Sequence, residues 1–194
     1  MKYLTLILAL LTTSCGLFDT REPENPINAG SQFEPATTPT LVLRNIESAL
    51  SSSNAADYRR CFSDTLRGLP AFVFQPSSQG ISTAPGLFGT WGAAQEEEYF
   101  ENIIAELQPG QLSSVTFTPS EVEAVPVGGT VSYQGSYRIR FPHTRAGVYR
   151  EAEGLLQLTL MLSKQNEWHI TYWHDIANNG NPSWSEIKAR FIER

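Results

Sequence analysis

Apolar residues recur at helical spacing in three regions of the first half of the chain. Residues 39–51 begin with a proline at the first helical position and then repeat apolar side chains every three or four positions, which predicts a helix. A second, shorter helix starts after its N-cap residue Asn54 and ends near Asp64. A third helix is predicted over 93–107, where a Pro-Gly pair ends it. The first two helices form a helical hairpin.

From the middle of the chain onward the apolar period changes from helical spacing to alternation, which indicates β-strands. Val131, Tyr133 and Tyr137 alternate with polar residues, which is typical of a half-buried antiparallel strand. A short strand is predicted earlier, at 71–74, and a capping box at Ser183 opens a last helix. The four long strands are predicted at 113–124, 130–142, 148–163 and 167–176.

These elements predict a single α+β domain over residues 38–194. In this domain N-terminal helices pack on a curved antiparallel sheet, and the C-terminal helix is an addition. Residues 75–89 are rich in Ser, Gly and Pro, so we expect a long loop there. A domain of this size buries about 70% of the surface that its unfolded chain exposes, which is enough for a substantial core.

The N-terminus has the layout of an exported and lipidated protein. Residues 1–14 place one positive charge before a short apolar run and small hydroxyl residues after it, which predicts a signal peptide. The segment Leu11–Cys15 resembles the bacterial lipobox, in which the cysteine is acylated. Residues 15–37 are rich in proline and poor in apolar residues. We therefore expect a lipid on Cys15, followed by a flexible tether.

Composition and charge narrow the possible functions. The chain has 194 residues, 41% of them hydrophobic, which excludes a disordered or fibrous protein. With 14 Lys and Arg against 20 Asp and Glu, the net charge of -6 disfavours binding to nucleic acid and to anionic lipid headgroups. Two cysteines are too few for a disulfide-stapled scaffold or a Cys-rich zinc fold. Because Cys15 is assigned to lipid, Cys61 is expected to be a small buried residue.

The order of the predicted elements resembles the nuclear transport factor 2-like superfamily, a cone-shaped α+β fold that is also called cystatin-like. The helical hairpin ends in Tyr58-x-x-x-Phe62-Ser63-Asp64, and the last strand, 168–175, looks like the superfamily's ending of aromatic, aliphatic, aromatic and acid. The lipobox and the extra helix with Trp184 resemble the bacterial lipoprotein branch, for which no activity is implied. The resemblance implies a pocket between sheet and helices, in a fold that serves both enzymes and binding modules.

Three residues are candidates for a catalytic acid or base. Asp64 follows the second helix, Asp175 lies near the end of the last strand, and His169 lies on that strand. A turn or a helix cap is the structural alternative for each aspartate. In a regular strand His169 and His174 face opposite sides of the sheet, and no pair of ligands has zinc-binding spacing. No metal and no cofactor are predicted.

Four aromatic residues are candidates to line a ligand pocket, with packing in the core as the alternative. They are Tyr133, Tyr137, Tyr172 and Trp173. The leading hypothesis is a lipid-anchored protein of the cell envelope, whose cone domain binds a small ligand or an envelope protein without chemistry. Because no aspartate follows Cys15, the resemblance to lipoproteins of two-membrane bacteria implies the outer membrane.

Two alternatives belong to other functional classes. One is a small lyase, isomerase or hydrolase that uses Asp64, Asp175 or a histidine as its base. The other is a structural or assembly protein whose sheet face docks another protein or pairs two copies of the chain.

Overall fold

The computed structural model describes residues 31–122, 128–178 and 180–192. The compact unit that it defines starts at Ser31, so the signal peptide, Cys15 and residues 16–30 lie outside the described residues. The helices are α2 (Pro39–Ser51), α3 (Ala55–Arg60), α4 (Ser78–Thr83), α5 (Ala93–Ala105) and α6 (Trp184–Ile192). The strands are β1 (Val73–Gln75), β2 (Ser114–Val122), β3 (Thr130–Arg140), β4 (Glu151–Leu162) and β5 (Trp168–Ala177).

The five strands form one sheet in the order β1-β5-β4-β3-β2. Strands β2 to β5 pair antiparallel with their sequence neighbours, as predicted. Strand β1 instead pairs parallel with β5, with Phe74 opposite Trp173, so the sheet is mixed rather than purely antiparallel. The sequence of a three-residue strand does not show whether it runs parallel or antiparallel to its neighbour. That direction depends on the long connection between β1 and β5.

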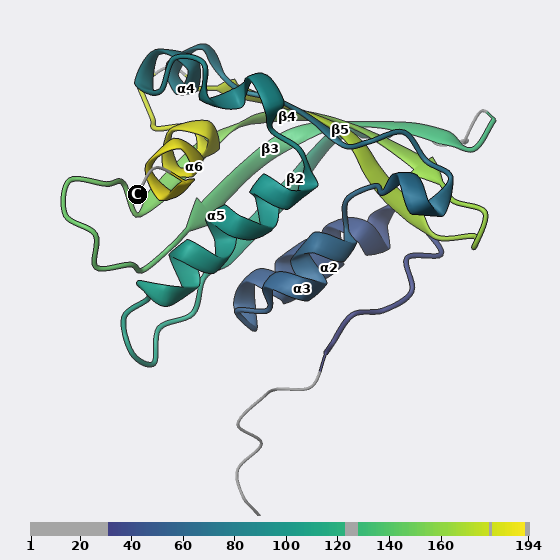
Figure 1. Ribbon diagram of the computed structural model, residues 1–194, viewed down its shortest axis with the longest axis horizontal. Coiled ribbons are helices and arrows are strands. Elements are labelled where there is room, and N and C mark those ends of the chain that lie inside the picture. Colours follow the sequence, from purple (N-terminus) through teal and green to yellow (C-terminus); the bar gives the residue numbers. More distant parts are fainter. Residues whose placement is uncertain (1–30, 123–127, 179, 193–194) are drawn as a thin grey trace, which may run out of the picture. The chain divides into compact units, whose positions relative to one another are not determined.

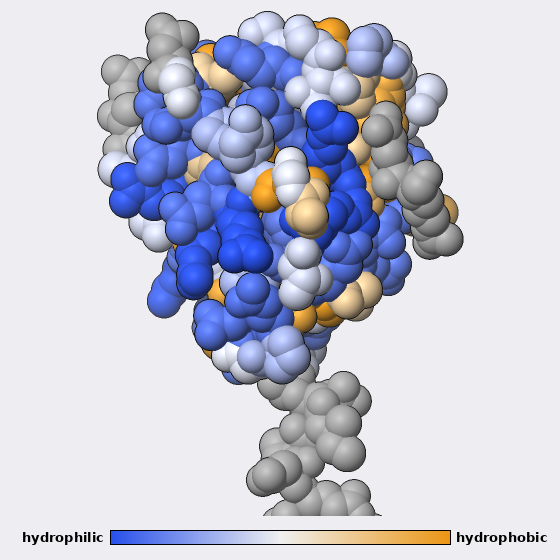
Figure 2. Space-filling model, turned by 90° about the vertical axis from the view of Figure 1, so that its left-hand side faces the viewer, coloured by the Kyte–Doolittle hydropathy of each residue, from blue (hydrophilic) through white to orange (hydrophobic). Residues whose placement is uncertain are grey.

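Helices α2, α3 and α5 lie along one face of the sheet, and α6 lies beside α4 near one end of it (Figure 1). The α+β architecture with N-terminal helices and a C-terminal helix is therefore confirmed. Figure 2 shows the side of the molecule at which α6 lies, and its surface is mainly hydrophilic with apolar residues in small separate groups. The apolar side chains of α6 are turned into the domain instead.

Helix α3 ends at Arg60, before the predicted end near Asp64, because the chain straightens to pair with the sheet. Ile170 donates its backbone N–H to the carbonyl of Cys61 at 2.9 Å and accepts one from Ser63 at 2.9 Å. These bonds replace the next helical turn. Cys61 is buried, as predicted.

The segment 75–89 is not the patternless loop that its composition predicts. It contains α4 and a short 3-10 helix, Leu87–Thr90. The hydroxyl of Ser77 caps α4 by accepting the backbone N–H of Gly80 at 3.1 Å. A Cβ atom at Gly80 would lie 2.3 Å from the Cβ of Ser185, so α4 rests closely on α6. Packing on a distant helix holds α4 in place, and local periodicity does not reveal such packing.

The last seven residues of the predicted 15–37 tether pack against the domain. The side chain of Asn45 bonds both the backbone N–H of Glu34, at 3.1 Å, and its carbonyl, at 2.7 Å. The guanidinium of Arg60 lies 3.8 Å from the ring centre of Phe33. The part of the chain that is fixed to the domain therefore extends further toward the N-terminus than residue 38.

Candidate functional site

Helix α6 fills the interior of the cone with two fully buried side chains, Trp184 and Lys188. The indole of Trp184 packs edge-on against Trp173, with ring centres 4.7 Å apart. Its ring N–H donates to the hydroxyl of Tyr99 at 3.0 Å, and its backbone N–H donates to the hydroxyl of Tyr137 at 2.8 Å. Side chains of α6 therefore fill the space between α5 and the sheet.

Lys188 forms a buried ion pair with Glu96, and neither side chain is exposed. The ammonium group also lies 3.8 Å from the ring centre of Phe74 and 4.5 Å from that of Trp173. Burial lowers the pKa of Lys188, while the charge of Glu96 opposes that change. Glu96 accepts a further hydrogen bond from the ring N–H of Trp91 at 2.8 Å. Both members of the pair are closed off from solvent, and each is bonded to the other.

Asp175 holds the beginning of α6. Its carboxylate accepts the hydroxyl of Tyr137 at 2.7 Å, the backbone N–H of Ser185 at 2.7 Å and the Ser185 hydroxyl. Burial raises the pKa of Asp175, and these hydrogen bonds oppose the rise. Tyr137 has room for this contact because its cross-strand partner is Gly154, where a Cβ would lie 2.6 Å from the Tyr137 hydroxyl. The structure gives Asp175 a bonded, solvent-free position under a helix N-terminus.

Asp64 and His169 lie apart from Asp175. Asp64 is partly exposed and caps a 3-10 helix, Thr65–Arg67, by accepting the backbone N–H of Leu66 at 2.9 Å. The Nδ1 atom of His169 is 3.1 Å from the Arg60 carbonyl oxygen, and burial lowers the pKa of the imidazole. Asp175 lies six positions from His169 along β5, which is roughly 20 Å of extended chain. The three candidates therefore do not converge on one site.

The condition under which His169 and His174 would face opposite sides of the sheet, a regular strand, is not met, because β5 contains a bulge. Leu160 pairs with Ile170 but Thr159 pairs with Tyr172, so one residue of β5 has no partner and the alternation shifts. Both histidines then occupy positions that alternate with core-facing residues. Within the described part of the chain, no group of three His, Cys, Asp or Glu is placed to hold a metal ion.

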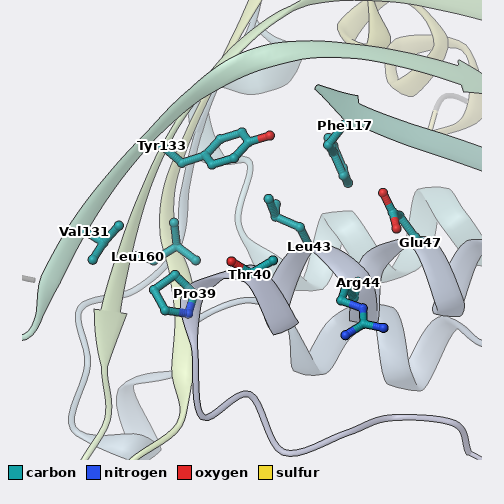
Figure 3. A pocket seen from close by; sticks show the side chains of 9 residues that line it. All are labelled: Pro39, Thr40, Leu43, Arg44, Glu47, Phe117, Val131, Tyr133 and Leu160. Carbon is teal, nitrogen blue, oxygen red and sulfur yellow. The ribbon is translucent and has the colours of Figure 1, made fainter. Parts of the chain in front are cut away.

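Among the hollows of the described domain, a cavity of about 150 Å³ lies between α2 and strands β2, β3 and β4. Figure 3 shows the side chains of Tyr133, Leu43 and Glu47 directed into this space, while the guanidinium of Arg44 turns away from it. We call this space the α2 cavity. It is lined by Pro39, Thr40, Leu43, Arg44, Glu47, Phe117, Val131, Tyr133 and Leu160.

Besides Thr40 and Arg44, two polar residues, Tyr133 and Glu47, line the α2 cavity. Tyr133 is 5% exposed, and its buried hydroxyl has no hydrogen-bond partner among the described residues. Burial raises its pKa to about 12. Glu47 is half-buried, and burial raises the pKa of its carboxyl group against the opposing effects of the Phe117 backbone N–H and of Arg44. A buried hydroxyl without a partner is costly unless a ligand or water bonds it.

Of the four predicted pocket residues, Tyr133 lines the α2 cavity and the other three do not. Tyr137 lies under α6, Trp173 packs in the core, and Tyr172 is half-buried on β5 opposite Val73. Glu47 was not among the site residues predicted from the sequence. Its position one helical turn after Leu43, beside the apolar stripe of α2, is the signal that points to it.

Comparison with known proteins gives structural matches only. No protein-family model matches the sequence, and no curated protein sequence does. A conserved protein from Planctomyces limnophilus is 14% identical, with a TM-score of 0.55 over 74% of this chain and 93% of that one. A protein from Novosphingobium aromaticivorans, described provisionally as an aromatic ring hydroxylase, is 16% identical, with a TM-score of 0.52 over 76% and 91% of the two chains.

A nuclear transport factor 2-like superfamily protein from Salmonella enterica is 10% identical, with a TM-score of 0.49 over 72% of this chain and 89% of that one. The described domain shares its α+β fold with the proteins from Planctomyces limnophilus and Novosphingobium aromaticivorans. At these identities the likeness concerns the fold alone. Among the described residues, no helix combines the length and the apolar character needed to cross a bilayer.

Proposed function

We propose that this protein is anchored by lipid in the bacterial cell envelope and that its domain binds a small apolar molecule in the α2 cavity without converting it. One contrast carries the proposal. The acids of the cone interior, Asp175 and Glu96, are bonded to α6, whereas the hydroxyl of Tyr133 is buried in the α2 cavity without a partner in the described chain. A ligand that bonds this hydroxyl would remove the cost of burying it without a partner.

The size and lining of the α2 cavity favour a ligand with about one ring. Its volume is about 150 Å³, and a cavity of this size lined by apolar side chains can hold a benzene molecule. Leu43, Val131 and Leu160 supply apolar walls that are buried in the free protein. Binding then gains from removing the apolar ligand surface from water, and the preformed walls need little ordering.

Toluene is expected to bind the purified full chain with a dissociation constant of about 0.1–1 mM, which isothermal titration calorimetry would measure. Val131→Phe fills the cavity and should weaken toluene binding by about tenfold or more. Thr40→Phe covers the exposed mouth of the α2 cavity without adding volume to the core. It should therefore also weaken toluene binding, and it replaces Val131→Phe if that variant folds poorly. Val73→Phe makes the same valine change at a 51% exposed position and should leave binding unchanged. Equal binding by all four proteins would contradict the proposal.

Lipid anchoring is supported by the sequence around Cys15, which lies outside the described residues. Expressed in a two-membrane bacterium, the full chain is expected to incorporate radiolabelled palmitate and to sediment with the outer membrane. Cys15→Ser should lose both the label and the membrane association, because the acylated sulfur is gone. Cys61→Ser is the matched control, since the chain has 2 cysteines and this one is buried, and it should keep both. Label retained by Cys15→Ser would contradict the anchor.

A second candidate function is a small lyase or isomerase that works in the same cavity. The observation in its favour is that Glu47, whose pKa burial raises, and the hydroxyl of Tyr133 border one apolar space, which suits a base and a hydrogen-bond donor. Ligand recovered unchanged after long incubation with the protein supports binding alone, and a converted ligand supports the enzyme. Pairing of two copies through the sheet face stays a prediction.

A further inference from the structure

We propose that the ligand of the α2 cavity is a small apolar amine, bound as its ammonium ion with the positive charge on Glu47. This inference rests on the proposed binding function and specifies its ligand class. It is carried by the placement of a carboxylate, an unpaired hydroxyl and an aromatic ring around one small apolar space. Each of these three groups interacts favourably with an ammonium ion.

Glu47 has no ion-pair partner within 4 Å among the described residues, although the charge of Arg44 is near enough to lower its pKa. No lysine, arginine or histidine nitrogen lies within 4 Å of it in the described part of the chain. Arg44, the neighbouring cation on α2, is exposed and directs its guanidinium away from the cavity (Figure 3). A half-buried carboxylate in this position gains from a cation brought by a ligand, because such a cation offsets the loss of hydration.

The neighbours of Glu47 can interact with the N–H donors of an ammonium ion that Glu47 itself does not bind. An ammonium group carries donors and no acceptor, and the Tyr133 hydroxyl oxygen is an acceptor with free lone pairs. The ring of Phe117 lines the same space, where its face can attract a cation. The apolar part of the ligand would then lie against Leu43 and Leu160.

The same chain already binds an ammonium group by these means. In the cone interior Lys188 pairs with Glu96 and lies 3.8 Å from the ring centre of Phe74. The α2 cavity offers the corresponding carboxylate and ring, but no lysine of its own. The net charge of -6 also favours the approach of cations over anions.

The test compares three probes of similar size with the full chain by titration calorimetry at pH 7: benzylamine, benzyl alcohol and toluene. Benzylamine is expected to bind about tenfold more tightly than benzyl alcohol. Glu47→Gln should remove that preference, lowering benzylamine affinity by about tenfold while leaving toluene affinity unchanged within about twofold. Retained toluene binding shows that this variant is folded. If Glu47→Gln does not fold, Tyr133→Phe serves instead and should weaken benzylamine binding without weakening toluene binding.

The pH dependence gives an independent readout. The groups that face Glu47 are Arg44 on its own helix and, from the sheet, Tyr133 and the Phe117 backbone N–H. The pKa of Tyr133 is raised to about 12, so Tyr133 stays neutral over the acidic and neutral range in which Glu47 titrates. Because its pKa is raised, benzylamine affinity should fall as the pH is lowered through that pKa, whereas toluene affinity should stay constant.

The outcomes separate the two proposals. Toluene binding without any preference for benzylamine would overturn the amine inference and leave the binding function intact. Failure of all three probes to bind would overturn both. A benzylamine preference that survives Glu47→Gln would also overturn the inference, because the charge of Glu47 would then have no part in it.

Discussion

Lys188→Met is expected to lower the free energy of unfolding by about 3–5 kcal/mol, the cost of leaving one member of a buried ion pair alone. Methionine has nearly the same length and fits among the rings around Lys188, so lost packing contributes little. The carboxylate of Glu96 would stay buried without its cation, although Trp91 and Tyr58 still donate to it. Urea unfolding followed by tryptophan fluorescence would measure the change.

The double variant Glu96→Gln/Lys188→Met should recover most of that loss, because replacing both charges by neutral groups of similar size is often close to neutral. A glutamine oxygen can still accept from Trp91, and its amide can donate to the Tyr58 hydroxyl. Lys164→Met is the matched control at an exposed lysine and is expected to change stability by less than about 0.5 kcal/mol. A Lys188→Met variant as stable as the parent would show that the Glu96–Lys188 ion pair contributes nothing to stability.

Tyr137→Phe and Tyr133→Phe each remove one hydroxyl oxygen from β3, but only Tyr137→Phe is expected to lower the free energy of unfolding. The Tyr137 hydroxyl donates to Asp175 at 2.7 Å and accepts from the Trp184 backbone N–H at 2.8 Å, so its loss leaves two buried groups short of a partner. We expect a loss of about 2–3 kcal/mol. The Tyr133 hydroxyl has no partner in the described chain, so its removal should be neutral or stabilising by up to about 1 kcal/mol.

Paired urea titrations of the two variants test this directly, because both make one chemical change on β3 and each serves as the control for the other. Equal destabilisation by both would show that the Tyr133 hydroxyl is bonded in solution. No loss in Tyr137→Phe would show that α6 is held without the Asp175 network.

Helix starts could be predicted from the sequence where the capping residues and the groups that they bond are close together in the chain. Helix α2 begins at Pro39, as the proline at its first position indicates, and the side chain of Asn54 accepts the Asp57 backbone N–H at the start of α3. At the start of α6 the Ser183–Glu186 capping box forms, with the Ser183 N–H donating to the Glu186 carboxylate at 2.7 Å. These signals hold because both partners lie within four residues of each other.

Prediction failed where a partner distant in sequence decides the structure. Helix α4 depends on the close contact between Gly80 and Ser185, and α3 ends early because Cys61 and Ser63 bond Ile170. The bulge in β5 shifts the alternation that single-strand reasoning uses. In each case a tertiary contact outweighs a local preference worth only a few tenths of a kcal/mol to about one per residue.

Local patterns in the sequence were enough to predict the α+β class and the burial of Cys61. They proposed candidate site residues but missed Glu47, and packing between distant segments determines which side chains meet. Asp175 belongs to the anchor of α6, Asp64 to a cap, and Tyr133 to a cavity that it shares with Glu47. The physical reason is that burial and hydrogen-bond partners set what a polar side chain can do, and both are properties of packing between segments far apart in the chain.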